Sequence, residues 1–411
     1  MSSTAPADVA AVERVFREAY GGAVATLIHV FGDITLAEDA VQDAFVVASD
    51  RWRIDGIPAN PAGWIVTTSK RRAIDVLRRS ARGRELQDQL AVVATTSLDC
   101  GANGQDEPVQ DDRLRLIFTC CHPALRTEHH VALTLRLLGG LSVAEVARAF
   151  LVSEAAMAKR FVRAKYKIKA ANISYRVPDE AGLPARMRSV LSVLSLIYTT
   201  GLGGEGRDPL RREAIRLARE LVELMPDEAE AAALLALMLL SESRAGARMT
   251  EGDVVLLRDQ DRTLWDRSMI AEGHALVRAA TSGGRPGPYQ FQAAIQAVHG
   301  DAGSYEATDW SQVVTLYDQL FEVMPTPVVA LNRAIALAEV EGPDEALATL
   351  DRIASDLDSY HLLHAARGTM LRRLRRNDDA RAAFERAARL ATSGTDQRFL
   401  DRQIEELSAI P

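Results

Sequence analysis

The chain has few of the residues that would place it among disulfide-rich, membrane-spanning or strand-rich proteins. Three cysteines in 411 residues are too few for a disulfide framework and fit a reducing compartment. No run of about eighteen apolar residues occurs, and no charged-then-apolar segment opens the chain, so neither a membrane span nor a secretory signal is expected. Alternating strand patterns are almost absent, whereas Ala and Leu are abundant. We therefore expect a cytoplasmic protein of the all-α class.

Residues that could hold a metal or perform catalysis are also scarce. Cys120, Cys121 and His122 are adjacent, but they lack the two-residue gap of a zinc knuckle and no second pair follows, so buried packing is preferred. His361 and His364 share a helix face without a third ligand close in sequence, which favours packing or capping. The glycines after residue 200 are not followed by the Lys and Ser/Thr of a phosphate loop. We expect no enzyme, no metal and no cofactor.

Charge is distributed unevenly along the chain. Residues 1–176 carry 23 Lys and Arg against 20 Asp and Glu, a net charge of +3. The remainder holds 26 of the 49 basic and 36 of the 56 acidic residues, a net charge of −10. Four of the five lysines lie between residues 159 and 169. This asymmetry predicts a DNA-facing N-terminal part and an acidic C-terminal part with another role.

Two helix starts mark the segment from Leu141 to Lys169. Ser142 followed by Glu145 forms a capping box, and Ser153 is a second N-cap candidate. The second helix has an apolar face at steps of three and four, and six basic residues with no acid lie from residue 159 to residue 169. Such a stripe can be an ordinary solvated face. Because it follows a capped helix at helix-turn-helix spacing, we favour insertion into the major groove of DNA.

Two amphipathic helices are expected at residues 12–29 and 36–52, separated by a turn at Gly32 and Asp33. Acidic and polar residues form one edge of the second helix. This edge suits docking on a basic partner helix, or it is an ordinary solvated face.

A basic helix is expected after the loop at residues 55–61. Its charge comes from seven Lys and Arg residues between 70 and 84, with Asp75 as the one acid among them. A basic helix preceded by a loop and an aromatic residue can bind phosphates while capturing unpaired bases. Trp64 suits that role and core packing equally. The following residues, 86–110, are polar and lack a period, which predicts a flexible linker.

Three segments of the first 170 residues resemble the sigma-70 family of bacterial RNA polymerase initiation factors, in the compact extracytoplasmic-function type. These segments occur in the order of that family. They are AEDAVQDAFVVASDRW (37–52), NPAGWIVTTSKRRAIDVLRR (60–79) and LSVAEVARAFLVSEAAMAKRFVRAK (141–165). The resemblance implies a sigma2-like domain at 8–85, the linker at 86–110 and a sigma4-like helix-turn-helix domain at 111–172.

The same resemblance implies three sets of binding residues. Those expected to bind the β′ clamp helices of RNA polymerase are Asp39, Gln42, Asp43 and Phe45. Those expected to recognise and melt the −10 element are Asn60, Trp64, Lys70, Arg71, Arg72, Asp75, Arg78 and Arg79. Those expected to recognise the −35 element are Ser153, Glu154, Ala156, Met157, Lys159, Arg160 and Arg163.

The C-terminal part, 178–411, contains signs of a helical repeat. Gly368, Ala380, Phe384 and Ala387 have the spacing of a tetratricopeptide repeat (TPR), and subtracting 34 from the last three gives apolar residues again. LVELMP (221–226) and LFEVMP (320–325) resemble each other and each follows an amphipathic helix. We expect a TPR-like α-solenoid, whose stacked helix pairs present a concave surface to a protein or peptide.

Three functions fit these features. The favoured one is a sigma factor that binds core RNA polymerase (β′ clamp helices and β subunit) and promoter DNA, with a C-terminal domain that modulates activity through a protein partner or an intramolecular contact. The alternative is a polymerase-independent helix-turn-helix regulator with a TPR sensor domain. A third is a repeat scaffold whose basic helices are incidental. None of the three involves a membrane.

Overall fold

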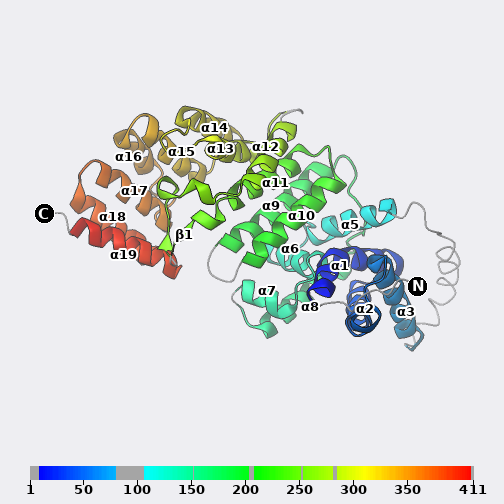
Figure 1. The fold of residues 1–411 in the computed structure, drawn as a ribbon. Coiled ribbons are helices and arrows are strands. Elements are labelled where there is room, and N and C mark those ends of the chain that lie inside the picture. Colours follow the sequence, from blue (N-terminus) through cyan, green and yellow to red (C-terminus); the bar gives the residue numbers. More distant parts are fainter. Residues whose placement is uncertain are drawn as a thin grey trace. The chain divides into compact units, whose positions relative to one another are not determined.

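The computed structural model describes residues 9–79, 106–150, 152–202, 208–250, 253–280 and 285–408. Helices dominate these ranges, and the strands found in them are β1 (Met249–Thr250) and β2 (Asp253–Val254), which pair antiparallel (Figure 1). The all-α prediction is confirmed. The chain folds into two compact units, and among the described residues unit 1 ends at Leu224 and unit 2 begins at Met225. None of the described helices combines the length and the apolar character needed to cross a membrane.

Unit 1 begins with three helices, α1 (Val9–Phe31), α2 (Ile34–Asp55) and α3 (Pro61–Arg79), which pack against one another. The predicted turn between the first two is confirmed. Gly32 has a φ of 67°, a left-handed conformation that glycine adopts without strain. Asp33 then caps α2, because its Oδ1 accepts hydrogen bonds from the backbone N–H groups of Thr35 and Leu36 at 2.8 and 3.0 Å.

The next part of unit 1 contains the helix-turn-helix. Its elements are α5 (Asp106–Cys120), α6 (Thr127–Leu133), the π-helix η1 (Thr134–Leu138), α7 (Val143–Ala149) and α8 (Glu154–Ala170). Both predicted caps are confirmed: Ser142 and Glu145 form a capping box, and the Ser153 Oγ accepts from the Ala156 N–H at 3.2 Å. Phe150 closes α7 with a φ of −92°, so this residue of the turn needs no glycine.

The predicted linker is too long at its C-terminal end. Residues 86–105 lie outside the described residues, whereas residues 106–110 form the first turn and a half of α5. The helix therefore begins inside the segment that was predicted to be the linker.

Two further helices, α9 (Leu183–Leu202) and α10 (Asp208–Leu224), belong to unit 1. They pair with each other, α9 packs on α6, and both pack on α5. The C-terminal domain was predicted to begin at residue 178. The structure instead places α9 and α10 in unit 1, where they pack with the segments that resemble sigma factors. Sequence periodicity shows the apolar face of such helices but not which element covers it.

Unit 2 is a TPR-like α-solenoid of successive helices, each packed on the next. It contains α11 (Ala229–Glu242), η2 (Ala245–Ala247), the strand pair, η3 (Leu257–Asp259), η4 (Arg262–Leu264), α12 (Arg267–Ala280), α13 (Pro288–Asp301), α14 (Trp310–Val323), α15 (Pro327–Val340), α16 (Pro343–Arg352), α17 (His361–Arg373), α18 (Asn377–Leu390) and α19 (Gly394–Ser408). The two similar segments of the sequence analysis each end a helix, α10 at Leu224 and α14 at Val323.

The spacing of small and bulky residues places Gly368 of α17 against Phe384 of α18. A Cβ atom at residue 368 would lie 2.8 Å from the phenyl ring, so only glycine allows this approach without a shift. Ala380 and Ala387 are fully buried in the same core cluster as the ring. Ala346, which lies 34 residues before Ala380, is also fully buried in α16. The predicted repeat is therefore present in the packing of these helices.

Both ends of α13 are capped by charged side chains from other elements. Glu230 of α11 accepts hydrogen bonds from the backbone N–H groups of Tyr289 and Gln290 at 3.1 and 3.0 Å. At the other end, the Nη1 atom of Arg262 donates to the carbonyl oxygens of His299 and Ala302 at 2.8 and 2.6 Å. A carboxylate at the N-terminus and a guanidinium at the C-terminus match the helix dipole. Burial raises the pKa of Glu230 nonetheless.

The adjacent cysteines are packing residues. Cys120 and Cys121 are buried and unpaired, and burial raises the pKa of the Cys121 thiol to about 12. Among the described residues, no three His, Cys, Asp or Glu side chains gather closely enough to hold a metal ion. His364 has its Nε2 atom 2.8 Å from the carbonyl oxygen of Asp358, which lies in the turn before α17.

Candidate nucleic-acid interface

Helix α3 presents a basic face to solvent. Asn60 caps the helix, because its Oδ1 accepts from the Gly63 N–H at 2.8 Å. Ile65, Ser69 and Ala73 are buried, which fixes the inner side of the helix against its neighbours. The outer side carries exposed residues of the predicted −10 set: Arg71, Arg72, Asp75, Arg78 and Arg79. Lys70 is half-buried.

Trp64 is held in place by a second tryptophan. Its ring lies edge-to-face with Trp52 of α2, with ring centroids 5.4 Å apart and planes at 63°. Trp52 is 2% exposed, whereas Trp64 is half-buried. One side of Trp64 therefore packs against the core, and another part of its side chain reaches solvent. Core packing and the capture of an unpaired base are thus compatible roles for this residue.

Helix α8 divides its residues between an apolar and a basic face. Met157, Phe161, Ala164 and Ile168 are buried, as their spacing predicts. The exposed residues of the predicted −35 set are Ser153, Glu154, Ala156, Lys159 and Arg163. Met157 is fully buried, so its side chain is not available for base contact and supports the helix instead.

Arg160 is fixed by two neighbours that the sequence analysis did not pair with it. Its guanidinium lies over the ring of Phe150, 5.5 Å from the centroid, and its Nη2 atom is 3.7 Å from the Glu128 carboxylate. The arginine is half-buried, and these contacts hold its side chain against Phe150 and against Glu128 of α6.

A groove of about 780 Å³ lies between α6 and α8. Besides Lys159, Arg160 and Arg163, its lining includes Arg126, His129, Tyr166 and Lys167, which the sequence analysis did not select. Burial lowers the pKa of His129, so this residue is more often neutral than a free histidine. A concave surface lined by five cations suits a phosphodiester backbone. The basic character of Arg126 was visible in the sequence, but its position beside α8 was not.

The acidic edge of α2 is partly exposed. Asp39 and Asp43 are exposed and Gln42 is half-buried. Burial raises the pKa of Asp39, and the nearby charge of Lys165 offsets part of that effect. Phe45 is 6% exposed and packs edge-to-face against Phe16, with ring centroids 4.6 Å apart. Phe45 therefore supports α2 from inside and is not on the surface that a partner would meet.

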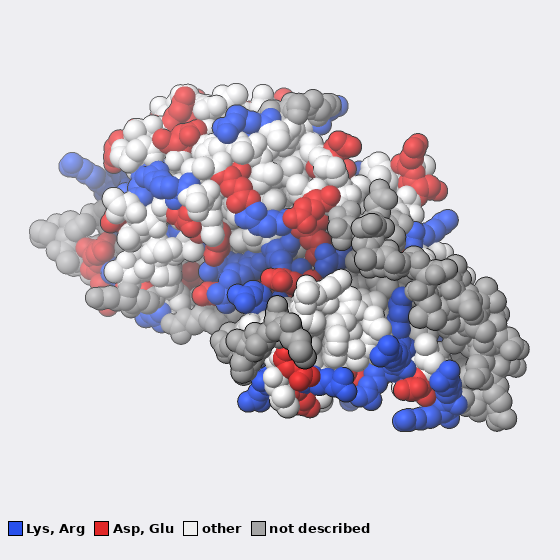
Figure 2. Space-filling model, turned by 45° about the vertical axis from the view of Figure 1, so that its right-hand side comes forward, with Lys and Arg blue, Asp and Glu red and all other residues white. Residues whose placement is uncertain are grey.

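Figure 2 shows Lys and Arg side chains gathered along the lower edge of one face of the molecule, at the level where Figure 1 places α8, α2 and α3. Asp and Glu side chains lie among them in smaller number. The two basic helices of unit 1 are therefore surface elements with a cationic character.

Three family models match this chain. Sigma-70 region 2 matches residues 16–83, which include α1, α2 and α3 from Phe16 onward. Sigma-70, region 4 matches residues 115–168, which include α7 and α8 up to Ile168. A family of unknown function (DUF6596) matches residues 186–281, which span the border between unit 1 and unit 2.

A relative that matches nearly the whole chain is also known. An uncharacterized protein from Rhizobium meliloti (strain 1021) is 41% identical over 397 residues, which cover 95% of this chain and 94% of the relative. Among solved structures, yeast Tom70 is 13% identical with a TM-score of 0.39, covering 85% of this chain and 61% of that chain. The TPR domain of P58(IPK) is 10% identical with a TM-score of 0.27, covering 91% and 99%. The assignment of unit 2 as a solenoid depends on the packing of its successive helices and not on the similarity to these two structures.

Proposed function

We propose that this chain binds core RNA polymerase and directs promoter-specific initiation. It belongs to the sigma-70 family, and the Rhizobium meliloti relative belongs to the same family as this chain. The observation that carries the proposal is the pair of basic surface helices, α3 and α8. Each lies in a segment matched by a different sigma-70 region, in the order of that family.

Helix α3 has the properties that strand opening requires. Its four exposed arginines can hold the phosphates of a separated strand, and the exposed part of Trp64 can stack on an unpaired base. In this proposal the −10 element is melted on this face.

Helix α8 has the properties that duplex recognition requires. Ser153 and Glu154 stand at its exposed N-terminal end, where a recognition helix contacts base edges. The cations of the groove beside it can hold the adjoining backbone. In this proposal the −35 element binds here.

The acidic edge of α2 is the proposed contact with the β′ clamp helices of the polymerase, and the β subunit is the second proposed partner surface. Asp39 and Asp43 are one helical turn apart and both exposed, so they can face a basic partner together. Unit 2 is proposed to modulate initiation through a protein partner, since a solenoid offers a concave binding surface.

Charge reversal at the acidic edge should weaken association with core polymerase. The full-length Asp39→Arg, Asp43→Arg double variant is expected to lose at least about tenfold in affinity, because like charges across an interface cost several kcal/mol. The measurement is titration of labelled protein with purified core polymerase. Wild-type protein and core should also give specific run-off transcripts that core alone does not.

The matched control is the charge reversal of Glu385 and Asp401, two exposed acids of unit 2, which should leave core affinity unchanged. Equal core binding by both double variants would contradict the polymerase contact. Tight specific DNA binding in the absence of core, together with that result, would favour the polymerase-independent regulator.

A further inference from the structure

The segments matched by the two sigma-70 regions are joined by a buried carboxylate. Glu38 of α2 is 5% exposed and lies between two cations. The Nε atom of Arg136 in η1 donates to its Oε1 at 2.5 Å, and the Nζ atom of Lys165 in α8 is 2.5 Å from its Oε2. Helix α2 carries the proposed polymerase contact and α8 the proposed −35 contact. These ion pairs therefore directly connect the two matched segments, residues 16–83 and 115–168, which are called the first and second module below.

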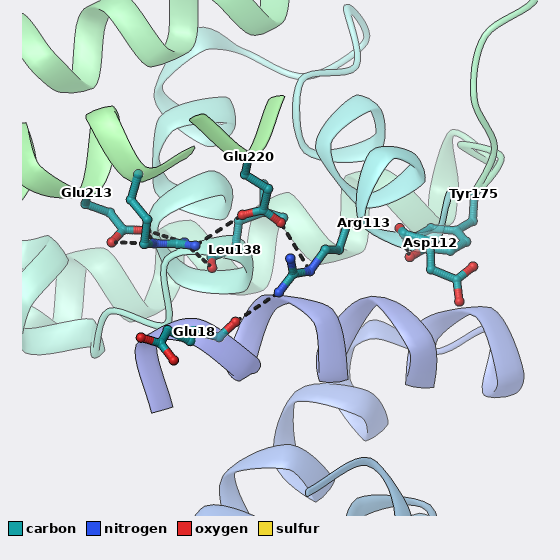
Figure 3. Close-up of polar contacts among 8 residues, drawn as sticks. Glu18, Asp112, Arg113, Leu138, Tyr175, Glu213 and Glu220 are labelled. Atoms are coloured by element: carbon teal, nitrogen blue, oxygen red, sulfur yellow. Dashed lines mark hydrogen bonds and ion pairs between the residues drawn. The ribbon is translucent and has the colours of Figure 1, made fainter. Parts of the chain in front are cut away.

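Helix α10 connects the same two modules from another side. Arg113 of α5 donates from its Nη2 atom to the carbonyl oxygen of Glu18 in α1 at 2.9 Å, and its Nε atom is 3.2 Å from the Glu220 carboxylate of α10 (Figure 3). Arg216, also on α10, donates to the carbonyl oxygen of Leu138 at 3.1 Å.

The carboxylates of α10 are buried and hold Arg216 in position. Glu213 and Glu220 are 4% and 7% exposed, and Arg216 pairs with them at 2.7 and 3.1 Å. Four elements thus meet at one polar cluster, namely α1, α5, η1 and α10 (Figure 3). Removing one member of a buried cluster of this kind leaves its partners unpaired, which is costly.

This closed arrangement cannot lie on a promoter. The −10 and −35 elements are about 25 base pairs apart, or ~85 Å at 3.4 Å per base pair. Helices α2 and α8 have 22 and 17 residues, so they are about 33 and 26 Å long. Two such helices joined by an ion pair cannot place their centres ~85 Å apart. Helix α3, the proposed −10 contact, packs directly against α2 and is therefore also held close to α8. The modules must therefore separate before both can bind.

We propose that α10 and the Glu38 cluster hold the free protein in a closed, inactive arrangement, and that engagement of polymerase and promoter requires these ion pairs to break. This inference rests on the proposed function, and it assigns a role to the first helices of the region matched by the family of unknown function. Asp39, a proposed polymerase contact, is the neighbour of Glu38.

The test uses two full-length variants at independent contacts, Glu38→Gln and Glu220→Gln. Both keep the side-chain shape and remove the charge, and two sites keep the test informative if one variant does not fold. Fluorescent dyes are attached at Arg14→Cys of α1 and Ala170→Cys of α8, both in a Cys100→Ser background, since the other two cysteines are buried. Energy transfer then reports the separation of the modules.

High energy transfer is expected in the free protein, and it should fall in the complex with core and promoter. Each variant should lower transfer in the free protein and raise run-off transcription at limiting core by about fivefold. Glu385→Gln, an exposed acid of α18, is the control and should change neither signal.

Low transfer in the free wild-type protein would overturn the inference, as would variants that leave transfer and transcription unchanged or that reduce transcription while folded. In each of these cases wild-type transcripts would still uphold the proposed function. The absence of core-dependent transcripts from wild type and both variants would instead refute the proposed function, whatever the energy transfer.

Discussion

Replacing the four exposed arginines of α3 with alanine is expected to abolish promoter opening while leaving the fold intact. The residues are Arg71, Arg72, Arg78 and Arg79. All four are exposed and none belongs to the buried side of the helix, so their loss removes charge without opening the core. Each lost contact with a single-stranded phosphate lowers the salt slope of binding by about 0.7, so four contacts lower it by ~3.

The measurement is permanganate reactivity of the promoter with core polymerase, repeated over a range of salt concentrations. Arg389→Ala, which removes an exposed arginine of α18, serves as the control for the loss of positive charge elsewhere. Normal opening by the quadruple variant with an unchanged salt slope would mean that α3 does not hold the separated strand.

Phe384→Ala is expected to be the most destabilising single substitution in unit 2. The ring is 1% exposed, and removing a buried phenyl group costs about 3–5 kcal/mol. Gly368→Ala should also destabilise, by about 1–3 kcal/mol, because its methyl group would collide with that ring.

The two substitutions should not be additive. Once the ring of Phe384 is gone, a methyl group at residue 368 has space, and alanine is favoured over glycine in a helix by about 1 kcal/mol. The double variant should therefore be more stable than Phe384→Ala alone. Denaturant unfolding of the four proteins measures the coupling. Additive losses would contradict the packing described for α17 and α18.

Local features of the fold could be predicted from the sequence because their causes are local. Asp33, Ser142 and Ser153 cap helices through bonds to residues two or three positions away, and such spacing is visible in a sequence. The same holds for the apolar face of α8 and for the spacing of Gly368 and Phe384.

Features that depend on distant partners could not be predicted. Glu38 is one of the acidic residues on the polar edge predicted for residues 36–52. Its partners are 98 and 127 residues away, and it is buried between them. Glu230 and Arg262 cap a helix to which neither belongs. The family resemblance also placed Phe45 and Met157 among the candidate contacts, although both are buried and the spacing of Met157 predicts its burial.

The central claim is that α3 and α8 contact one promoter at the same time within a complex with polymerase. The most direct measurement places a photo-crosslinking amino acid at Arg78 or at Arg163 of the full-length protein in an open complex. We expect Arg78 to crosslink to the separated strand of the −10 element and Arg163 to the −35 duplex, both requiring core polymerase. Crosslinks to neither element, or the same crosslinks without polymerase, would contradict the account.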